Sequence, residues 1–286
     1  MFFRWILVSL CFLASPIYSE SSLSAEKLSN HYSPQFLRIL QIVFGTEEIL
    51  SHGGHECIDI MFDSIDLNHK KVLDIGSGFG GVDIYLAEKF NAEIIGVDME
   101  PYMVAVANGF LEKHHDSLIG QVSFHTLENP YSLDELEDNS FDVVFSKESF
   151  YNVPREKKQA YLAEIYRKLR PGGILIFTDW YQGTPKIQDA LKRATKNENI
   201  CQFITPEAFS QMLENTYFRT IFYKSLAAEC LQYTRQDMQR LHQNAALISE
   251  LFGKKVYEDR VQAWQTWLDA QEAQELVNCL FVAEKW

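Results

Sequence analysis

The chain is acidic and of moderate length. It has 286 residues, 47% of them hydrophobic, and a formal net charge of −13, which provides for one sizeable core or a core with a cap. A protein that binds nucleic acid normally presents a basic face, and no run of Lys and Arg stands out, so no nucleic-acid partner is expected. A small-molecule substrate is expected instead, and composition leaves the oligomeric state open.

The first residues have the pattern of a secretory signal. Arg4 precedes a short apolar run over 5–14, and a cleavage site with only partly suitable residues ends at Ser19. The run is too short to span a bilayer, so no stable membrane span is expected after cleavage of a leader over 1–19. The alternative interpretation is a buried N-terminal helix.

A helical segment is expected before the first strand. From Tyr32 to about Ile65, apolar residues recur at helical spacing, and Gly53 and Gly54 interrupt the pattern. We therefore expect an N-terminal helical cap over 20–66.

Strand and helix patterns then alternate. Strands are predicted near 71–75, 93–98, 120–125, 141–146 and 173–179, with helices near 80–90, 100–114 and 155–169. This order predicts a parallel sheet with helices on both faces.

About a hundred residues follow these predicted strands and helices, more than a minimal α/β domain needs. Thr205 and Pro206 have the pattern of a helix start, and a strand is predicted over 218–222. Two long helical patterns follow, at 231–251 and 256–271, before a last apolar run at 276–283. We interpret the two helices as a lid inserted between the last two, antiparallel strands. The expected parts after the cap are thus a core over 67–226, a lid over 227–274 and a final core strand over 275–286.

The segment after the first predicted strand carries the strongest chemical signal. Its glycines permit left-handed backbone and close approach of a ligand. Gly76, Gly78 and Gly81 also fit the dinucleotide pattern G-x-G-x-x-G, which leaves an NAD site open. Asp74, two residues before the first glycine, favours S-adenosylmethionine (AdoMet), because a carboxylate there would face the ammonium and sulfonium of that cofactor.

A second acid ends the next strand. Asp98 stands where a parallel α/β sheet places a carboxylate for the two ribose hydroxyls, and a helix N-cap is the alternative. Met99 is expected to pack on the adenine face. Glu128, past the third strand, is expected to accept from the adenine amino group, with a solvated loop acid as the alternative.

Three segments together resemble the class I AdoMet-dependent methyltransferases: the glycine loop with its strand, a fourth strand and a helix-to-strand corner, at 71–81, 139–146 and 169–177. The resemblance implies an α/β fold, a Rossmann-like doubly wound seven-stranded sheet with an N-terminal helical cap and a C-terminal helical insertion. It also implies AdoMet as cofactor, with Gly76, Gly78 and Gly80 passing under its methionine part.

The cap resembles a narrower family. Tyr32, the series over 43–48 and the Ser-His-Gly-Gly series over 51–54 are similar to the N-terminal part of phosphoethanolamine N-methyltransferases. Carried over by position, Tyr32 matches the catalytic tyrosine of that family, and Gly53 and Gly54 match a turn that closes over the cofactor. Lys147 and Glu148 keep the charge types of the Arg-Asp pair of that family, with Lys147 on the cofactor side and Glu148 on the substrate side.

The catalytic residues depart from that family. Its histidine falls on Asn152, which cannot accept a proton near neutral pH. His31, beside Tyr32, could act as the base, or could simply be exposed.

The phosphate-binding residues depart as well. The Arg and Tyr that hold the phosphate in that family fall near Asn199 and Cys201, and a late substrate lysine falls near Trp267. The loss of cationic donors argues against a phosphorylated substrate. Tyr151, Trp180 and Tyr181, with Phe150 and Trp264 or Trp267, could bind an amine through cation–π attraction, or could be ordinary core residues.

The predicted function is therefore methyl transfer from AdoMet to a small molecule, with an amine favoured. O-methylation, an NAD-dependent oxidoreductase and a non-catalytic AdoMet-binding protein remain alternatives. No Cys or His spacing indicates a metal, and the four cysteines after the leader could form two disulfides or be buried thiols: Cys57, Cys201, Cys230 and Cys279. The leader predicts the secretory pathway or periplasm, whereas a cytosolic cofactor favours a cytoplasmic or membrane-tethered protein.

Overall fold

The computed structural model describes residues 33–184, 189–195 and 202–286. The predicted leader, His31, Tyr32, Asn199 and Cys201 lie outside the described residues.

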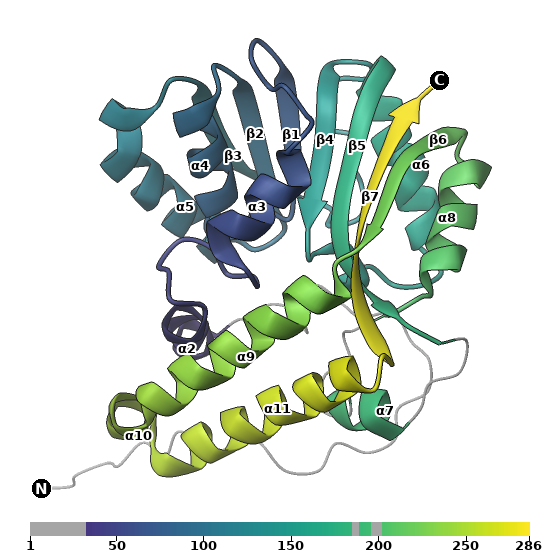
Figure 1. Ribbon diagram of the computed structural model, residues 1–286. Helices are drawn as coiled ribbons and strands as arrows, with labels where there is room; N and C mark the ends of the chain where they lie inside the picture. Colours follow the sequence, from purple (N-terminus) through teal and green to yellow (C-terminus); the bar gives the residue numbers. More distant parts are fainter. Residues whose placement is uncertain (1–32, 185–188, 196–201) are drawn as a thin grey trace, which may run out of the picture.

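A seven-stranded sheet forms the centre of the molecule (Figure 1). Its spatial order is β3-β2-β1-β4-β5-β7-β6. The first five strands pair in parallel, and β7 is antiparallel to both of its neighbours, as predicted. The strands are β1 Lys71–Ile75, β2 Glu93–Asp98, β3 Gln121–Thr126, β4 Phe141–Lys147, β5 Leu169–Gln182, β6 Phe218–Ser225 and β7 Leu276–Lys285.

Helices cover both faces of the sheet, which confirms the Rossmann-like doubly wound fold (Figure 1). All seven residues of β4 are buried, as expected for a central parallel strand covered on both sides. Alternate residues of each strand serve the two faces: Val143 packs with α3 and α4, and Val144 packs with α6 and α8. The helices are α3 Gly54–Phe62, α4 Gly81–Lys89, α5 Pro101–His114, α6 Lys158–Lys168 and α8 Pro206–Asn215. The predicted start of α8 is confirmed, because the Thr205 side chain accepts from the N–H of Ala208 at 3.2 Å.

The predicted N-terminal cap begins with α2, Pro34–Phe44. Ser33 caps this helix by accepting from the N–H of Phe36, and Gly45 ends it in a left-handed conformation at φ 70°. One face of α2 packs with α4 and α5, and another packs with the inserted helices. The cap therefore connects the core to the insertion.

The inserted helices lie between β6 and β7 in the chain, and they lie beside α2 below the sheet in Figure 1. They are α9 Ala227–Gln243, α10 Ala245–Phe252 and α11 Lys254–Glu272. The helix predicted over 231–251 is thus two helices, which meet at Asn244. A short helix that the sequence patterns did not predict, α7 Asp189–Thr195, packs against α11.

Two further observations concern the described residues alone. None of their helices combines the length and apolar character needed to cross a bilayer. Cys57, Cys230 and Cys279 are buried free thiols.

Candidate active site

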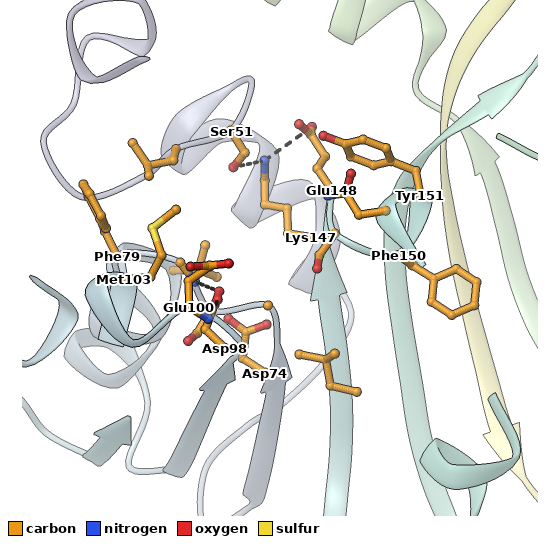
Figure 2. Close-up of a pocket in the computed structure, with 18 of the residues that line it drawn as sticks. Ser51, Asp74, Phe79, Asp98, Glu100, Met103, Lys147, Glu148, Phe150 and Tyr151 are labelled. Atoms are coloured by element: carbon orange, nitrogen blue, oxygen red, sulfur yellow. Dashed lines mark hydrogen bonds and ion pairs between the residues drawn. The ribbon is translucent and has the colours of Figure 1, made fainter. Parts of the chain in front are cut away.

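A cavity of about 260 Å³ opens at the carboxyl ends of the central strands. It lies where the strand order reverses between β1 and β4, the place where open α/β sheets bind ligands. Its lining residues come from the cap, the glycine loop, the ends of β2 and β4, and α11. Figure 2 labels those that lie around the strand ends.

Asp74 lines this cavity from β1, although it is only 2% exposed. Apart from the carboxyl group of Asp83, its Oδ1 has no hydrogen-bond partner among the described residues. A buried carboxylate oxygen without a partner is costly unless a ligand supplies one. Burial, and secondly the neighbouring Asp83, raise the pKa of Asp74 well above its usual range.

Asp83, in the first turn of α4, was not predicted as a site residue. It is fully buried behind the cavity lining, and apart from the carboxyl group of Asp74, neither of its carboxylate oxygens has a hydrogen-bond partner within the described chain. Burial raises the pKa of Asp83 to about 7, although its contact with Asp74 acts in the opposite direction. Two adjacent buried carboxyl groups cannot both ionise easily, so we interpret Asp74 and Asp83 as a pair that holds a shared proton.

Asp98 lies at the end of β2 and faces the same cavity (Figure 2). Its two carboxylate oxygens accept from the backbone N–H groups of Gly78 and Glu100, both at 2.9 Å. The N-cap of α5 is Glu100, so the alternative of Asp98 as helix cap is not what the structure shows. Each oxygen of Asp98 keeps a lone pair for a ribose hydroxyl, and Met99 lines the cavity beside it.

Lys147 joins the sheet to the cap. From the end of β4, its Nζ donates to Ser51 Oγ at 2.7 Å and to the carbonyl oxygen of His52 at 2.9 Å (Figure 2). Glu148 Oε1 lies 3.6 Å from the same Nζ. Lys147, predicted to bind cofactor, lines the cavity, and these contacts also hold the loop over 51–52 at the cavity rim.

Aromatic rings form the wall on the side of the insertion. Trp180 and Trp267 meet edge to face with centroids 5.4 Å apart, and Trp264 lies 6.3 Å from Phe44. All four rings, and Tyr151, line the cavity. The indole N–H groups of Trp264 and Trp267 are buried and have no acceptor in the described part of the chain.

His52 is a cavity residue to which sequence reasoning assigned no role. Its Nδ1 lies 2.7 Å from Asp237 Oδ2, on α9. Its ring meets Phe44 and Trp180 edge to face, with centroids 5.1 and 5.3 Å apart. The segment that holds His52 had been singled out, but its partner is 185 residues away, and no local pattern indicates that pairing.

Comparison with known proteins agrees with this geometry. Residues 73–177 match the family model described as a methyltransferase domain. Residues 73–177 thus form a methyltransferase domain.

Relatives match most of the chain, beyond residues 73–177. The chain is 28% identical over 239 residues to the phosphoethanolamine N-methyltransferase of Plasmodium falciparum, and the match covers 82% of this chain and 86% of that protein. It is 26% identical over 281 residues to phosphoethanolamine N-methyltransferase 3 of Arabidopsis thaliana, which covers 96% of this chain. The chain spans only 55% of that plant relative.

Solved structures show the same fold. The phosphoethanolamine N-methyltransferase 2 of Haemonchus contortus, in complex with phosphomonomethylethanolamine and S-adenosylhomocysteine, superposes with a TM-score of 0.79. The identity is 22%, and the match covers 92% of this chain and 60% of that one.

The methyltransferase domain brings most of the predicted site residues to the cavity. The lining includes Asp74, Gly76, Gly78, Asp98, Met99, Lys147, Glu148, Tyr151, Asn152 and Trp180. The Oδ1 of Asn152 is buried without a partner among the described residues. No cluster of His, Cys, Asp and Glu able to hold a metal is found within the described ranges.

Four predicted residues lie elsewhere. Tyr181 follows Trp180 on β5, so it points to the other face of the sheet and packs on Phe209 and Phe281. Glu128 is exposed and outside the lining, and it meets Glu135 through its backbone N–H.

The other two are glycines, and neither Gly54 nor Gly80 lines the cavity. Gly54 begins α3. A Cβ added at Gly80 would meet the Phe124 ring at 2.2 Å, so this glycine makes room for a core ring.

Two of the lining glycines, Gly76 and Gly78, allow a paired test. Both have positive φ, 81° at Gly76 and 55° at Gly78. A Cβ at Gly76 would lie 2.1 Å from Ser149 Oγ, whereas a Cβ at Gly78 would meet nothing within 4 Å. We expect Gly76→Ala to lower the free energy of unfolding by about 3 kcal/mol, through left-handed strain and overpacking. We expect Gly78→Ala to cost about 1 kcal/mol but to weaken AdoMet binding at least tenfold, because its Cβ enters space left for ligand.

Urea unfolding and isothermal titration separate these two effects. Unchanged AdoMet affinity in Gly78→Ala would contradict the assignment of the open space to ligand.

Proposed function

We propose that the protein transfers a methyl group from AdoMet to a small-molecule amine. The observation that carries the proposal is the buried Asp74 carboxyl group at the cavity, on the strand next to the one that ends in Asp98: apart from the proton shared with Asp83, its Oδ1 has no donor among the described residues. The residues fit AdoMet: Asp74 would meet its ammonium, Asp98 its ribose hydroxyls, and Gly76 and Gly78 would allow its backbone to pass closely. When bound, AdoMet supplies an electrophilic methyl group on a sulfonium.

The acceptor side of the cavity favours an amine. The rings of Trp180, Trp264 and Trp267, with Tyr151, line this side of the cavity, and the face of an aromatic ring attracts a cationic group. Such rings also exclude water, which protects an in-line displacement from competing hydration. Relatives named phosphoethanolamine N-methyltransferases support an amine acceptor as well.

The same side offers little to a phosphate. Among the described lining residues, the basic side chains are Lys147 and His52. Lys147 is held by Ser51, the His52 carbonyl and Glu148, and the His52 ring is held by Asp237. We therefore propose an acceptor without a phosphate group, unlike the substrate that the names of the relatives give.

Two measurements test the proposal. In isothermal titration we expect AdoMet to bind and NAD to give no response, and tight NAD binding without an AdoMet response would instead indicate an oxidoreductase. Labelled AdoMet is then incubated with ethanolamine, phosphoethanolamine, tyramine, a phenol without an amine and a carboxylic acid. We expect label on the amines, and more on ethanolamine than on phosphoethanolamine.

The other outcomes are also informative. Label only on oxygen acceptors would replace the amine by an O-methylation substrate. A preference for phosphoethanolamine would overturn the proposal that the acceptor has no phosphate group. AdoMet binding without transfer to any acceptor, including those of a cell extract, would leave a non-catalytic AdoMet-binding protein.

A further inference from the structure

A buried imidazole–carboxylate pair connects the cap to the insertion at the cavity wall. His52, 7% exposed, lines the cavity, whereas Asp237, 2% exposed, lies behind it on α9 and outside the lining. We infer that His52 is the general base that removes a proton from the acceptor amine, and that Asp237 is a positioning residue that holds its ring. This inference rests on the proposed function.

The geometry leaves one ring nitrogen of His52 available to a ligand. Nδ1 is engaged by Asp237 Oδ2 at 2.7 Å, so a neutral imidazole carries its proton there and has its lone pair on Nε2. No described residue makes a hydrogen bond to Nε2. Phe44 and Trp180, which also line the cavity, hold the ring edge to face from two sides and fix its orientation.

Charged groups surround the pair on two elements. On α9, Arg240 Nη1 lies 3.1 Å from the other carboxylate oxygen of Asp237, which leaves Oδ2 for His52. At the end of β4, Lys147 and Glu148 face His52 with opposite charges. Burial lowers the pKa of His52, the hydrogen bond and charge of Asp237 raise it, and the net shift is upward. Asp237 thus keeps a desolvated imidazole basic enough to accept a proton.

Three other polar residues of the described lining, at the end of β4 and just after it, are less suited to the role. Lys147 is fully buried, and its pKa is raised: burial lowers it, but the charges around it outweigh that effect, so it stays protonated. Glu148 lies beside the Lys147 ammonium and accepts from Asn278 at 3.4 Å. Asn152 has no basic site.

The proton transfer completes a balanced reaction. Neutral His52 takes the proton of R–NH₃⁺ at Nε2 and becomes imidazolium, which the Asp237 carboxylate stabilises. The amine lone pair then forms a bond to the methyl carbon as the carbon–sulfur bond breaks and its electron pair stays on sulfur. The products are R–NH₂⁺–CH₃ and S-adenosylhomocysteine, and His52 returns its proton to solvent.

The test compares the pH dependence of methyl transfer in three variants, using labelled AdoMet and the best amine of the panel above. The wild-type rate should rise with pH to a plateau, with an acid limb set by His52. His52→Ala should lower the plateau about 10²–10⁴-fold, the range for general-base catalysis, and added imidazole should restore part of the loss. Asp237→Asn, which keeps the shape of the side chain, should move the acid limb to lower pH and lower the plateau at least tenfold. Asp59→Asn, the same chemical change at an exposed carboxylate of α3 that pairs with Lys89 outside the cavity lining, is the control, and with AdoMet saturating at every pH it should leave the acid limb in place.

AdoMet binding shows whether a variant is folded, independently of whether it transfers the methyl group. Each variant is first titrated with AdoMet, and a dissociation constant within threefold of wild type shows that its cofactor half is intact. The wild type could transfer the methyl group while His52→Ala keeps its turnover or Asp237→Asn keeps its acid limb. Either result would overturn the role of His52 as general base and leave the proposed function standing. Failure of the wild type to methylate any amine would overturn both.

Discussion

Asp74→Asn is expected to weaken AdoMet binding about 100-fold. The substitution removes the charge that faces the ligand ammonium, and a hydrogen bond to a charged group contributes about 1.5–3 kcal/mol, which corresponds to roughly 10–150-fold. Isothermal titration at pH 8 measures the effect, because the carboxyl groups of the wild type are more ionised at that pH than at lower pH.

Two controls make this result specific. Asp83→Asn is the same chemical change at the neighbouring buried carboxyl group, outside the cavity lining, and it should keep AdoMet binding at pH 8 within threefold. The ligand 5′-methylthioadenosine lacks the amino-acid part, so Asp74→Asn should leave its affinity unchanged. An equal loss for both ligands would mean that Asp74 only supports the fold of the loop.

AdoMet affinity is expected to rise with pH, by up to tenfold per unit, as the pH approaches about 7 from below. Burial raises the pKa of Asp83 to about 7 and also raises the pKa of Asp74, so the empty site holds a proton that the unfolded chain would lose near pH 4. A bound ammonium favours the ionised pair and expels that proton, and binding is therefore favoured as the proton becomes easier to remove. The free energy of unfolding of the ligand-free protein should fall as the pH rises, because these carboxyl groups ionise less easily in the folded state than in the unfolded state.

Titrations in buffers of different ionisation enthalpy count the protons released. We expect up to one at pH 6 in the wild type. In Asp83→Asn the new amide can donate to Asp74 and lower its pKa, so the count should fall towards zero and the pH dependence should flatten. A wild-type affinity that does not change with pH would contradict the shared proton.

The cofactor half of the cavity was predictable because short segments hold it. A strand, a glycine turn and a helix place Asp74 and Gly76 by local geometry, and a parallel sheet brings Asp98 to the same edge. The same rules could have excluded Tyr181. Successive residues of a strand point to opposite faces, so Trp180 and Tyr181 could not both line one cavity.

The acceptor half depends on distant partners. The pairing of His52 with Asp237 joins a loop of the cap to a helix that follows six strands, and neither residue stands in a pattern that names the other. Asp83 was missed for a different reason. An acid in the first turn of a helix is normally explained by the helix dipole, and only its burial against Asp74 shows a second use.

The position of β7 has a consequence for synthesis on the ribosome. β7 is made after α9, α10 and α11, yet it lies between β5 and β6 (Figure 1). Until it emerges, β6 has no neighbour in the sheet and β5 has an open edge, so a nascent chain that ends within α11 presents unpaired backbone to other chains. The lid helices are thus translated before the strand that anchors them, and the incomplete sheet keeps its open edges until the last steps of synthesis.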